Sequence, residues 1–307
     1  MSKEYILSAN KVSKTYGQYK ALNSLSLNIP KGKIFGLLGP NGAGKTTFIR
    51  IINQITMPDT GEVFFDGAVL KSNHIAEIGY LPEERGLYKN MKVGEQALYF
   101  AQLKGLSKKE AKKRLDFWFD HLKISSWWNK KLSELSKGMA QKVQFVTTVL
   151  HQPKLLIFDE PFSGFDPVNA EVIKNEILYL KEKGTSVIFS THRMESVEEM
   201  CDKIALMNQG KIILEGKVKE IKNRFKSNVY QMVFKDFDRS QFEKFRHHAE
   251  VLEATEEGTE LWLKVKQKTA TDLLSQATQI GTISTFSEIL PTMNEVFINA
   301  VNKAQNG

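Results

Sequence analysis

The chain has 307 residues, of which 41% are hydrophobic and 25% are charged, and this length favours a large globular domain with a smaller second one. No apolar run approaches the roughly 20 residues that a membrane-spanning helix needs, and the first residues lack the basic-then-apolar pattern of a secretory signal. Cys201 is the single cysteine, so an internal disulfide is excluded and we expect a cytoplasmic protein.

The positive charge is concentrated in the first part of the chain. The net charge is +8, but residues 228–307 hold 8 Lys/Arg and 11 Asp/Glu, a balance of −3, so the remainder carries +11. A basic domain suits anionic partners such as a nucleotide, a nucleic acid or an acidic membrane face. A solvated, lysine-rich surface is an equally open explanation.

Residues 1–227 are expected to form an α/β domain around a mixed sheet. A strand is predicted at 34–38, followed by a glycine-rich loop and a helix from residue 45. Two further apolar runs, 155–158 and 186–189, have strand length and end in polar residues, as strands do when their carboxyl ends form a site. The alternation of strands and helices favours a partly parallel sheet.

A helical insertion interrupts this pattern over residues 93–126, within a helical subdomain that extends to about residue 150. Its apolar residues recur with a spacing near 3.6, and Ser107 is the expected N-cap of its second helix, with Glu110 three residues later. The aromatic residues Phe117, Trp118 and Phe119 point about 100° apart on a helix, so they cannot share one buried face.

Residues 228–307 are predicted to form a small accessory or regulatory α+β domain. The order of elements is strand, helix, strand, strand, helix, strand, which is typical of a ferredoxin-like sheet, and a last helix follows. The predicted ranges are 229–234, 240–247, 251–254, 260–265, 270–279, 282–287 and 292–301.

A phosphate-binding loop of the pattern G-x-x-x-x-G-K-T joins the first predicted strand to its helix. Its glycines allow backbone N–H groups to turn toward phosphates, and the positive end of the helix points at them. Lys45 should reach the β- and γ-phosphates, and Thr46 should hold Mg²⁺. The predicted nucleotide-binding residues are Gly39, Pro40, Asn41, Gly42, Ala43, Gly44, Lys45, Thr46 and Thr47.

Two adjacent carboxylates, Asp159 and Glu160, end the apolar strand at 155–158. Carboxylates at the end of a buried strand are costly unless a cation or a proton uses them. Asp159 fits a contact to Mg²⁺, and Glu160 fits the base that polarises an attacking water, although a solvated strand end is the alternative. Between the loop and this strand, Ser136 could cap a helix or help to bind an anion.

Together these motifs resemble those of the ABC ATPase family. They occur along the chain in the same order as in the family, and the resemblance covers roughly residues 4–220. The resemblance assigns the signature to Leu135–Met139, the D-loop to residues 163–166 with Asp166 at the dimer interface, the switch histidine to His192, and adenine stacking to Tyr16. Alternatively, Asp166 is a simple turn residue before Pro167, and Tyr16 is an ordinary strand aromatic. The family fold is a P-loop ABC cassette that binds ATP with Mg²⁺.

The two-part chain is similar to cassettes of the sodium-efflux and antibiotic-export type, whose C-terminal extension ends in a segment like residues 291–297. This implies an ATPase subunit that dimerises, with itself or a homologue, around two MgATP. Ser136 and Gly138 would then act on the partner's nucleotide. An integral-membrane permease is the expected partner, and the chain would be peripheral on the inner face of the cell membrane. The region 93–126 would receive a helix of that permease.

Two departures from the family pattern concern turnover. The signature has Lys137 and Met139 in place of Gly and Gln, and the Q-loop glutamine is replaced by Glu83, or by Glu84 if the alignment shifts by one. Glu83 is still expected to act in catalysis and to contact Mg²⁺.

These departures leave open a regulatory module that never hydrolyses ATP. A soluble ABC ATPase acting on a nucleic-acid or ribosomal partner is the other alternative, although no nucleic acid is expected. A GTPase is disfavoured because the sequence contains no N-K-x-D motif.

Overall fold

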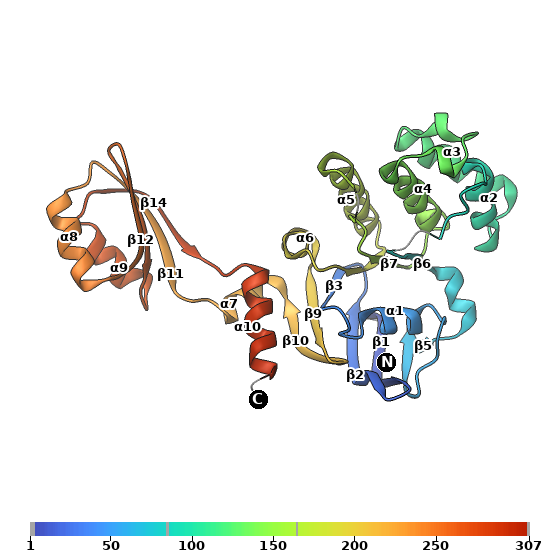
Figure 1. Cartoon of the computed structure of the whole chain (residues 1–307), viewed down its shortest axis with the longest axis horizontal. Helices are drawn as coiled ribbons and strands as arrows, with labels where there is room; N and C mark the ends of the chain where they lie inside the picture. The colour runs from blue at the N-terminus through green and yellow to red at the C-terminus, as the bar shows by residue number, and fades with distance from the viewer. Residues whose placement is uncertain (1–3, 84–85, 164, 306–307) are drawn as a thin grey trace. The chain divides into compact units, whose positions relative to one another are not determined.

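The computed structural model describes residues 4–83, 86–163 and 165–305, and the chain in Figure 1 separates into two compact units. The first unit runs to Val218 and the second begins at Lys219, at the start of α7 (Val218–Arg224). No helix in the described ranges is long and apolar enough to cross a membrane.

A six-stranded mixed sheet forms the centre of the first unit, in the order β10-β9-β3-β8-β7-β6. Neighbouring strands from β9 to β6 run parallel, and β10 is an antiparallel edge. Every residue of β3, β7 and β8 is buried, which is why these strands read as continuous apolar runs. The predicted α/β core is therefore confirmed, with β3 (Ile34–Leu38), β6 (Ile78–Leu81), β7 (Leu155–Asp159), β8 (Ser186–Ser190), β9 (Lys203–Asn208) and β10 (Lys211–Lys217).

A second, antiparallel sheet of order β2-β1-β4-β5 packs into the same core. Buried and exposed residues alternate along β2, as expected when one face of a strand is covered. Phe48 and Ile52 of α1 belong to a single apolar cluster with residues of both sheets. The elements are β1 (Tyr5–Tyr16), β2 (Tyr19–Pro30), β4 (Thr60–Phe65), β5 (Ala68–Val69), α1 (Lys45–Ile52) and the short helix η1 (Ser72–Glu77).

The predicted helical insertion is present. Ser107 caps α3 by accepting a hydrogen bond from the backbone N–H of Glu110 at 3.2 Å, as expected. Of the three consecutive aromatic residues, Trp118 and Phe119 are buried and Phe117 is 54% exposed. The helices of the first unit after β6 are α2 (Val93–Leu103), α3 (Lys108–His121), η2 (Ser125–Trp127), η3 (Leu132–Glu134), α4 (Lys137–Val149), α5 (Pro167–Glu182) and α6 (Met194–Met200).

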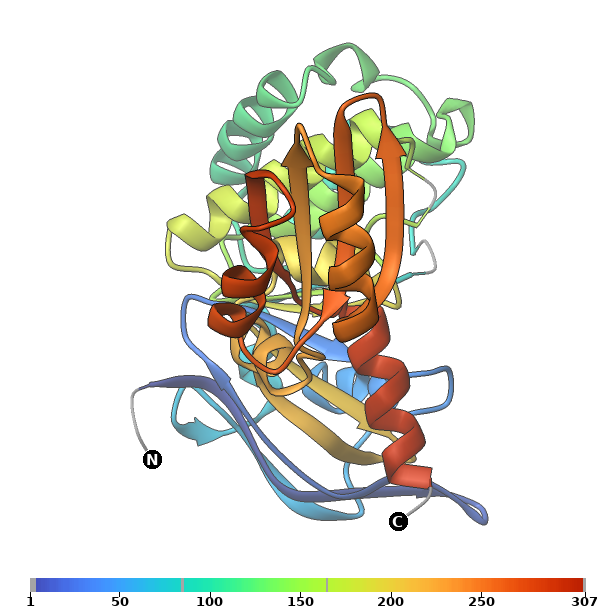
Figure 2. The same ribbon diagram turned by 90° about the vertical axis from the view of Figure 1, so that its left-hand side faces the viewer.

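The second unit has the predicted ferredoxin-like arrangement. Its antiparallel sheet has the order β12-β13-β11-β14, and Figure 2 shows helices α8 and α9 of this unit on one face of the sheet. Met232, Phe234 and Leu263 pack with Phe242 of α8 and Leu273 of α9 in one core. The elements are β11 (Val229–Lys235), α8 (Arg239–His248), β12 (Glu250–Glu257), β13 (Glu260–Lys266), α9 (Ala270–Ala277), β14 (Thr282–Ile289) and α10 (Met293–Gln305).

Gly94 in α2 gives a test of the packing in the helical insertion. A Cβ atom at this position would overlap the ring of Trp128, so Gly94→Ala should lower the free energy of unfolding by about 1–3 kcal/mol instead of giving the usual helical gain of alanine. Thermal denaturation followed by circular dichroism measures the effect. The control is Glu95→Ala, an exposed neighbour on α2, which should change stability by less than about 0.5 kcal/mol. A Gly94→Ala protein as stable as the wild type would contradict the packing described.

Candidate functional site

The glycine-rich loop between β3 and α1 has a backbone that only glycine can adopt at its key positions. Gly39, Gly42 and Gly44 have φ angles of 151°, 79° and 105°. A Cβ atom at Gly39 would overlap the carbonyl oxygen of Met207, and one at Gly44 would overlap that of Ala21. The loop therefore lies tightly against its neighbours, with its backbone held for close approach by a ligand.

Helix α1 begins directly after this loop, and neither its N-cap side chain nor an acidic residue of its first turn neutralises the positive end of the helix dipole. Its N-cap, Gly44, provides no side-chain hydrogen bond, and its first turn contains no acidic residue. Thr46 and Asn41 are exposed and Thr47 is half-buried, so polar groups surround this helix terminus. Free N–H groups and the helix dipole together make it suited to an anion such as a phosphate.

Lys45 occupies the loop. Its Nζ donates hydrogen bonds to the carbonyl oxygens of Gly39 at 2.6 Å and Pro40 at 3.1 Å. Burial lowers the pKa of Lys45, while the charges of Asp159, Glu160 and Glu83 act in the opposite direction. The ammonium group thus lies among the loop carbonyls and the field of three carboxylates, where phosphate oxygens could replace its present acceptors.

Asp159 ends β7 beside Ser190, the last residue of β8. It is 7% exposed, and burial raises the pKa of its carboxyl group, with the charges of Glu160 and Glu83 adding to the effect. A carboxylate with a raised pKa is stabilised in its charged form by a nearby cation. Asp159 is therefore a suitable oxygen ligand for a hard divalent cation.

Glu160 and His192 meet at the ends of β7 and β8. Oε1 of Glu160 accepts hydrogen bonds from the backbone N–H of His192 at 2.9 Å and lies 2.7 Å from its Nδ1. Oε2 accepts a hydrogen bond from the Thr191 hydroxyl at 3.1 Å. Glu160 has a φ of 50°, a conformation that is costly for a residue with a Cβ and that concentrates at functional sites. The side chain of His192 is 72% exposed, whereas that of Glu160 is 11% exposed, so the histidine covers the carboxylate from the solvent side.

Two tyrosines flank the loop, of which the sequence analysis found only one. Tyr16, at the end of β1, is 44% exposed, and Lys14 Nζ lies 5.6 Å from the centre of its ring. Tyr19 pairs with it across the hairpin, and its hydroxyl donates a 2.6 Å hydrogen bond to the carbonyl oxygen of Gly42. The spacing of two aromatic residues across a tight turn was the available signal.

The remaining predicted residues lie apart from this centre or act on it through charge. Ser136 caps α4, and no hydrogen bond joins Ser136 or Gly138 to the glycine-rich loop within the described ranges. Asp166 caps α5, where the backbone N–H of Asn169 holds the pKa of its carboxyl below the usual range. Glu83 is exposed, and its charge raises the pKa of both Lys45 and Asp159. Two predicted positions, Gly164 of the D-loop and Glu84, lie outside the described residues.

Comparison with known proteins identifies the family. The model described as ABC transporter matches residues 22–163, and that of the ATP-binding protein DrrA1-3-like C-terminal domain matches residues 216–301. The ABC transporter ATP-binding protein YhaQ of Bacillus subtilis is 42% identical over 96% of this chain and 98% of its own length. This chain belongs to the ABC transporter ATP-binding proteins.

Two further comparisons cover the whole chain and the cassette. The linearmycin resistance ATP-binding protein LnrL of Bacillus subtilis is 30% identical over 97% of this chain and 99% of its own length. A solved ATP-binding subunit of an ABC transporter superimposes with a TM-score of 0.66 at 29% identity, covering 72% of this chain and 93% of that one. As a member of the family, this ABC cassette binds ATP and is an ATPase.

Removal of the Lys45 ammonium group should weaken nucleotide binding, because its charge lies where the loop would receive phosphates. We expect Lys45→Ala to lower the affinity for a fluorescent ATP analogue by about 10- to 100-fold in equilibrium titrations. Lys33→Ala is the matched control, since Lys33 is exposed and precedes the first residue of β3, whereas the loop follows the last. Equal affinities for Lys45→Ala and the wild type would contradict the assignment of the loop.

Proposed function

We propose that the chain is the ATP-hydrolysing subunit of an export system, in which two ATPase subunits close around two MgATP and drive an integral-membrane permease. The observation that carries this proposal is the convergence of Lys45, Asp159, Glu160 and His192 at the carboxyl ends of adjacent parallel strands. Export is supported by the full-length similarity to a linearmycin resistance protein. The chain would be peripheral on the inner face of the cell membrane, and the second unit would be accessory or regulatory.

The phosphates would be held by the backbone N–H groups between Asn41 and Thr47, by Lys45 and by the start of α1, with Gly39 and Pro40 shaping the loop, and Tyr16 would stack on the adenine. The donors fit Mg²⁺, which prefers carboxylate and hydroxyl oxygens together with substrate phosphates. Thr46, Asp159 and Glu83 would be its protein ligands, and bound Mg²⁺ would neutralise charge on the transferred phosphoryl group. The described residues contain no group of three or more His, Cys, Asp or Glu that could hold a metal ion.

In hydrolysis, Glu160 would accept a proton from the attacking water through its carboxylate. His192 holds this carboxylate by two contacts, through its backbone N–H and Nδ1, so it fixes the direction of the base. With Nδ1 directed to Glu160, Nε2 of the exposed ring would be the atom that contacts the γ-phosphate. Since proton removal and phosphate contact come from neighbouring strand ends, positioning supplies most of the catalysis.

A second subunit would complete each site. Ser136 is exposed and Gly138 half-buried at the start of α4, and neither is bonded to the glycine-rich loop of its own chain. The free N–H groups of this helix terminus, together with the Ser136 hydroxyl, suit the γ-phosphate of a nucleotide held by the partner. Asp166 would lie at the same interface. Hydrolysis would remove the phosphate shared by both subunits and allow them to separate.

The exchange Glu160→Gln tests the catalytic part of this proposal. Without the carboxylate base we expect ATP hydrolysis to fall by about 100-fold or more, while MgATP binding persists because the phosphate contacts remain. Trapped ATP should then increase the dimer fraction in size-exclusion chromatography. Glu195→Gln makes the same chemical change at an exposed position on α6 and should leave the rate unaltered. Hydrolysis by Glu160→Gln at the wild-type rate would refute the assignment of the base.

Docking of the permease is proposed at an apolar groove beside α2. The groove has a volume of 610 Å³ and is lined by residues that include Tyr80, Pro82, Phe100, Leu103 and Ile55. Ile55 and Leu103 are 63% and 64% exposed, so bulky apolar surface is available to a partner helix. Lys104 fixes the groove by donating two 2.8 Å hydrogen bonds, to the carbonyl oxygens of Ile75 and Ile78.

Charged residues in this groove should uncouple transport. We expect Ile55→Glu combined with Leu103→Glu to abolish co-purification with the permease from detergent-solubilised membranes. ATPase activity of the isolated chain should persist, because neither residue belongs to the nucleotide site. Met57→Glu is the matched control, since Met57 is 62% exposed but does not line the groove. Full transport and permease association in the double variant would place the docking surface elsewhere.

A further inference from the structure

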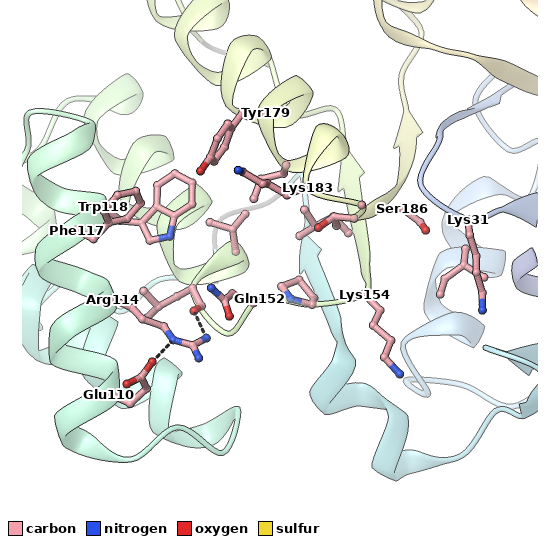
Figure 3. A pocket seen from close by; sticks show the side chains of 18 of the residues that line it. Lys31, Glu110, Arg114, Phe117, Trp118, Gln152, Lys154, Tyr179, Lys183 and Ser186 are labelled. Carbon is pink, nitrogen blue, oxygen red and sulfur yellow. Dashed lines mark hydrogen bonds and ion pairs between the residues drawn. The ribbon is translucent and has the colours of Figure 1, made fainter.

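A second cleft lies at the end of the central sheet opposite the nucleotide site. It has a volume of 870 Å³ and is formed by α3, the C-terminal ends of α4 and α5, and the beginnings of β7 and β8 (Figure 3). Because β7 and β8 run from this cleft toward Asp159 and His192, their length separates it from the glycine-rich loop. Its volume falls within the range of small-molecule sites, about 300–1,000 Å³.

Aromatic side chains form the walls of this cleft. Phe117 and Trp118 enter from α3, and Tyr179 enters from α5, as Figure 3 shows. Phe117 is 54% exposed and Tyr179 is 40% exposed. Trp118 is 6% exposed and packs edge-on against Phe145. Exposed aromatic rings that enter a cleft from two different helices suit the apolar body of a ligand.

Cationic groups outnumber acidic ones in the lining. There are five cationic side chains against the carboxylates of Asp66 and Glu110: Lys31, Lys113, Arg114, Lys154 and Lys183. Asp66 forms ion pairs with Lys31 and Lys154, and Glu110 pairs with Arg114 at 2.8 Å. No ion pair is recorded for Lys113 or Lys183 within the described ranges, and Lys183 Nζ lies 5.4 Å from the centre of the Tyr179 ring. These two ammonium groups therefore lie outside the ion pairs of the described residues, although the charge of Lys113 also lowers the pKa of Glu110.

Arg114 keeps the cleft in shape. Its Nε bonds to Glu110 on the same helix, and its guanidinium group also donates a 3.1 Å hydrogen bond to the carbonyl oxygen of Leu150, at the end of α4. Both contacts are drawn in Figure 3. Because a guanidinium fixed in this way holds α3 against α4, the aromatic wall is positioned before any ligand arrives.

We propose that this cleft binds a small amphipathic organic anion, with its acidic group between Lys113 and Lys183 and its aromatic or acyl body against Phe117, Trp118 and Tyr179. A nucleoside triphosphate would require more free hydrogen-bond donors than these two lysines provide. A monoanion with a carboxylate, sulfonate or phosphodiester group matches both the two ammonium groups and the aromatic side chains. Such a ligand would come either from solution or from the anionic lipids of a membrane.

The probe for the test is 8-anilinonaphthalene-1-sulfonate, a fluorescent aromatic monoanion, titrated against the full chain. We expect saturable binding that excess MgATP does not displace and that dissolved laurate does displace. Lys113→Glu combined with Lys183→Glu should weaken binding by about tenfold, through the loss of two favourable charges and the gain of two repulsive ones. Lys108→Glu combined with Lys109→Glu makes the same change in net charge outside the cleft and should bind as the wild type does.

Circular dichroism and MgATP binding establish that the variants are folded, and if the cleft variant is not, Lys183→Gln decides the same question by a smaller change. Co-sedimentation with phosphatidylglycerol vesicles distinguishes the sources: sedimentation of the wild type but not of the cleft variant assigns the ligand to lipid, and competition by laurate alone assigns it to solution. Equal probe binding by the cleft variant and its control would overturn the proposal. Displacement by a short acidic peptide but not by laurate would also overturn it, in favour of a protein partner.

Discussion

The parallel pairing of β3, β8 and β7 is the constraint on which the nucleotide site depends. Hydrogen bonds between these strands bring their carboxyl ends to one edge of the sheet, so groups more than a hundred residues apart in sequence become neighbours. Lys45 follows β3, Asp159 ends β7, and His192 follows β8. A shift in register between β7 and β8 would separate Glu160 from His192, whose backbone N–H and Nδ1 contact its carboxylate.

At this edge of the sheet, Lys45 and Asp159 partly compensate each other's charge. Lys45 and Asp159 are both substantially buried, and burial shifts their pKa values toward the neutral forms, down for the lysine and up for the aspartate. Each provides the opposite charge that limits the shift of the other. Lys45 lies in the field of three carboxylates, those of Asp159, Glu160 and Glu83, so among these four described residues negative charge is in excess. This excess gives a physical reason for a divalent cation to accompany the nucleotide.

Much of this arrangement could be predicted from sequence, because local patterns determine it. The strand-loop-helix around Lys45, the apolar run before Asp159 and the cap at Ser107 depend on residues within a few positions of one another. Tyr19 was missed because its contact with Gly42 spans 23 residues. The unusual backbone of Glu160 and the basic aromatic cleft were likewise invisible, since they arise from packing between separate segments. No periodicity records such contacts.

The backbone of Glu160 has a consequence for the evolution of this site. A φ of 50° costs a residue with a Cβ about 1–2 kcal/mol, whereas glycine adopts it without penalty and asparagine tolerates it well. Selection for thermal robustness alone would therefore favour glycine or asparagine here and eliminate the carboxylate. In the proposed function, Glu160 accepts this backbone strain, at a cost to folding stability, because its carboxylate is held beside His192 as the base. Variants selected for thermostability without an activity screen would therefore tend to replace Glu160 and so to lose the carboxylate proposed as the base.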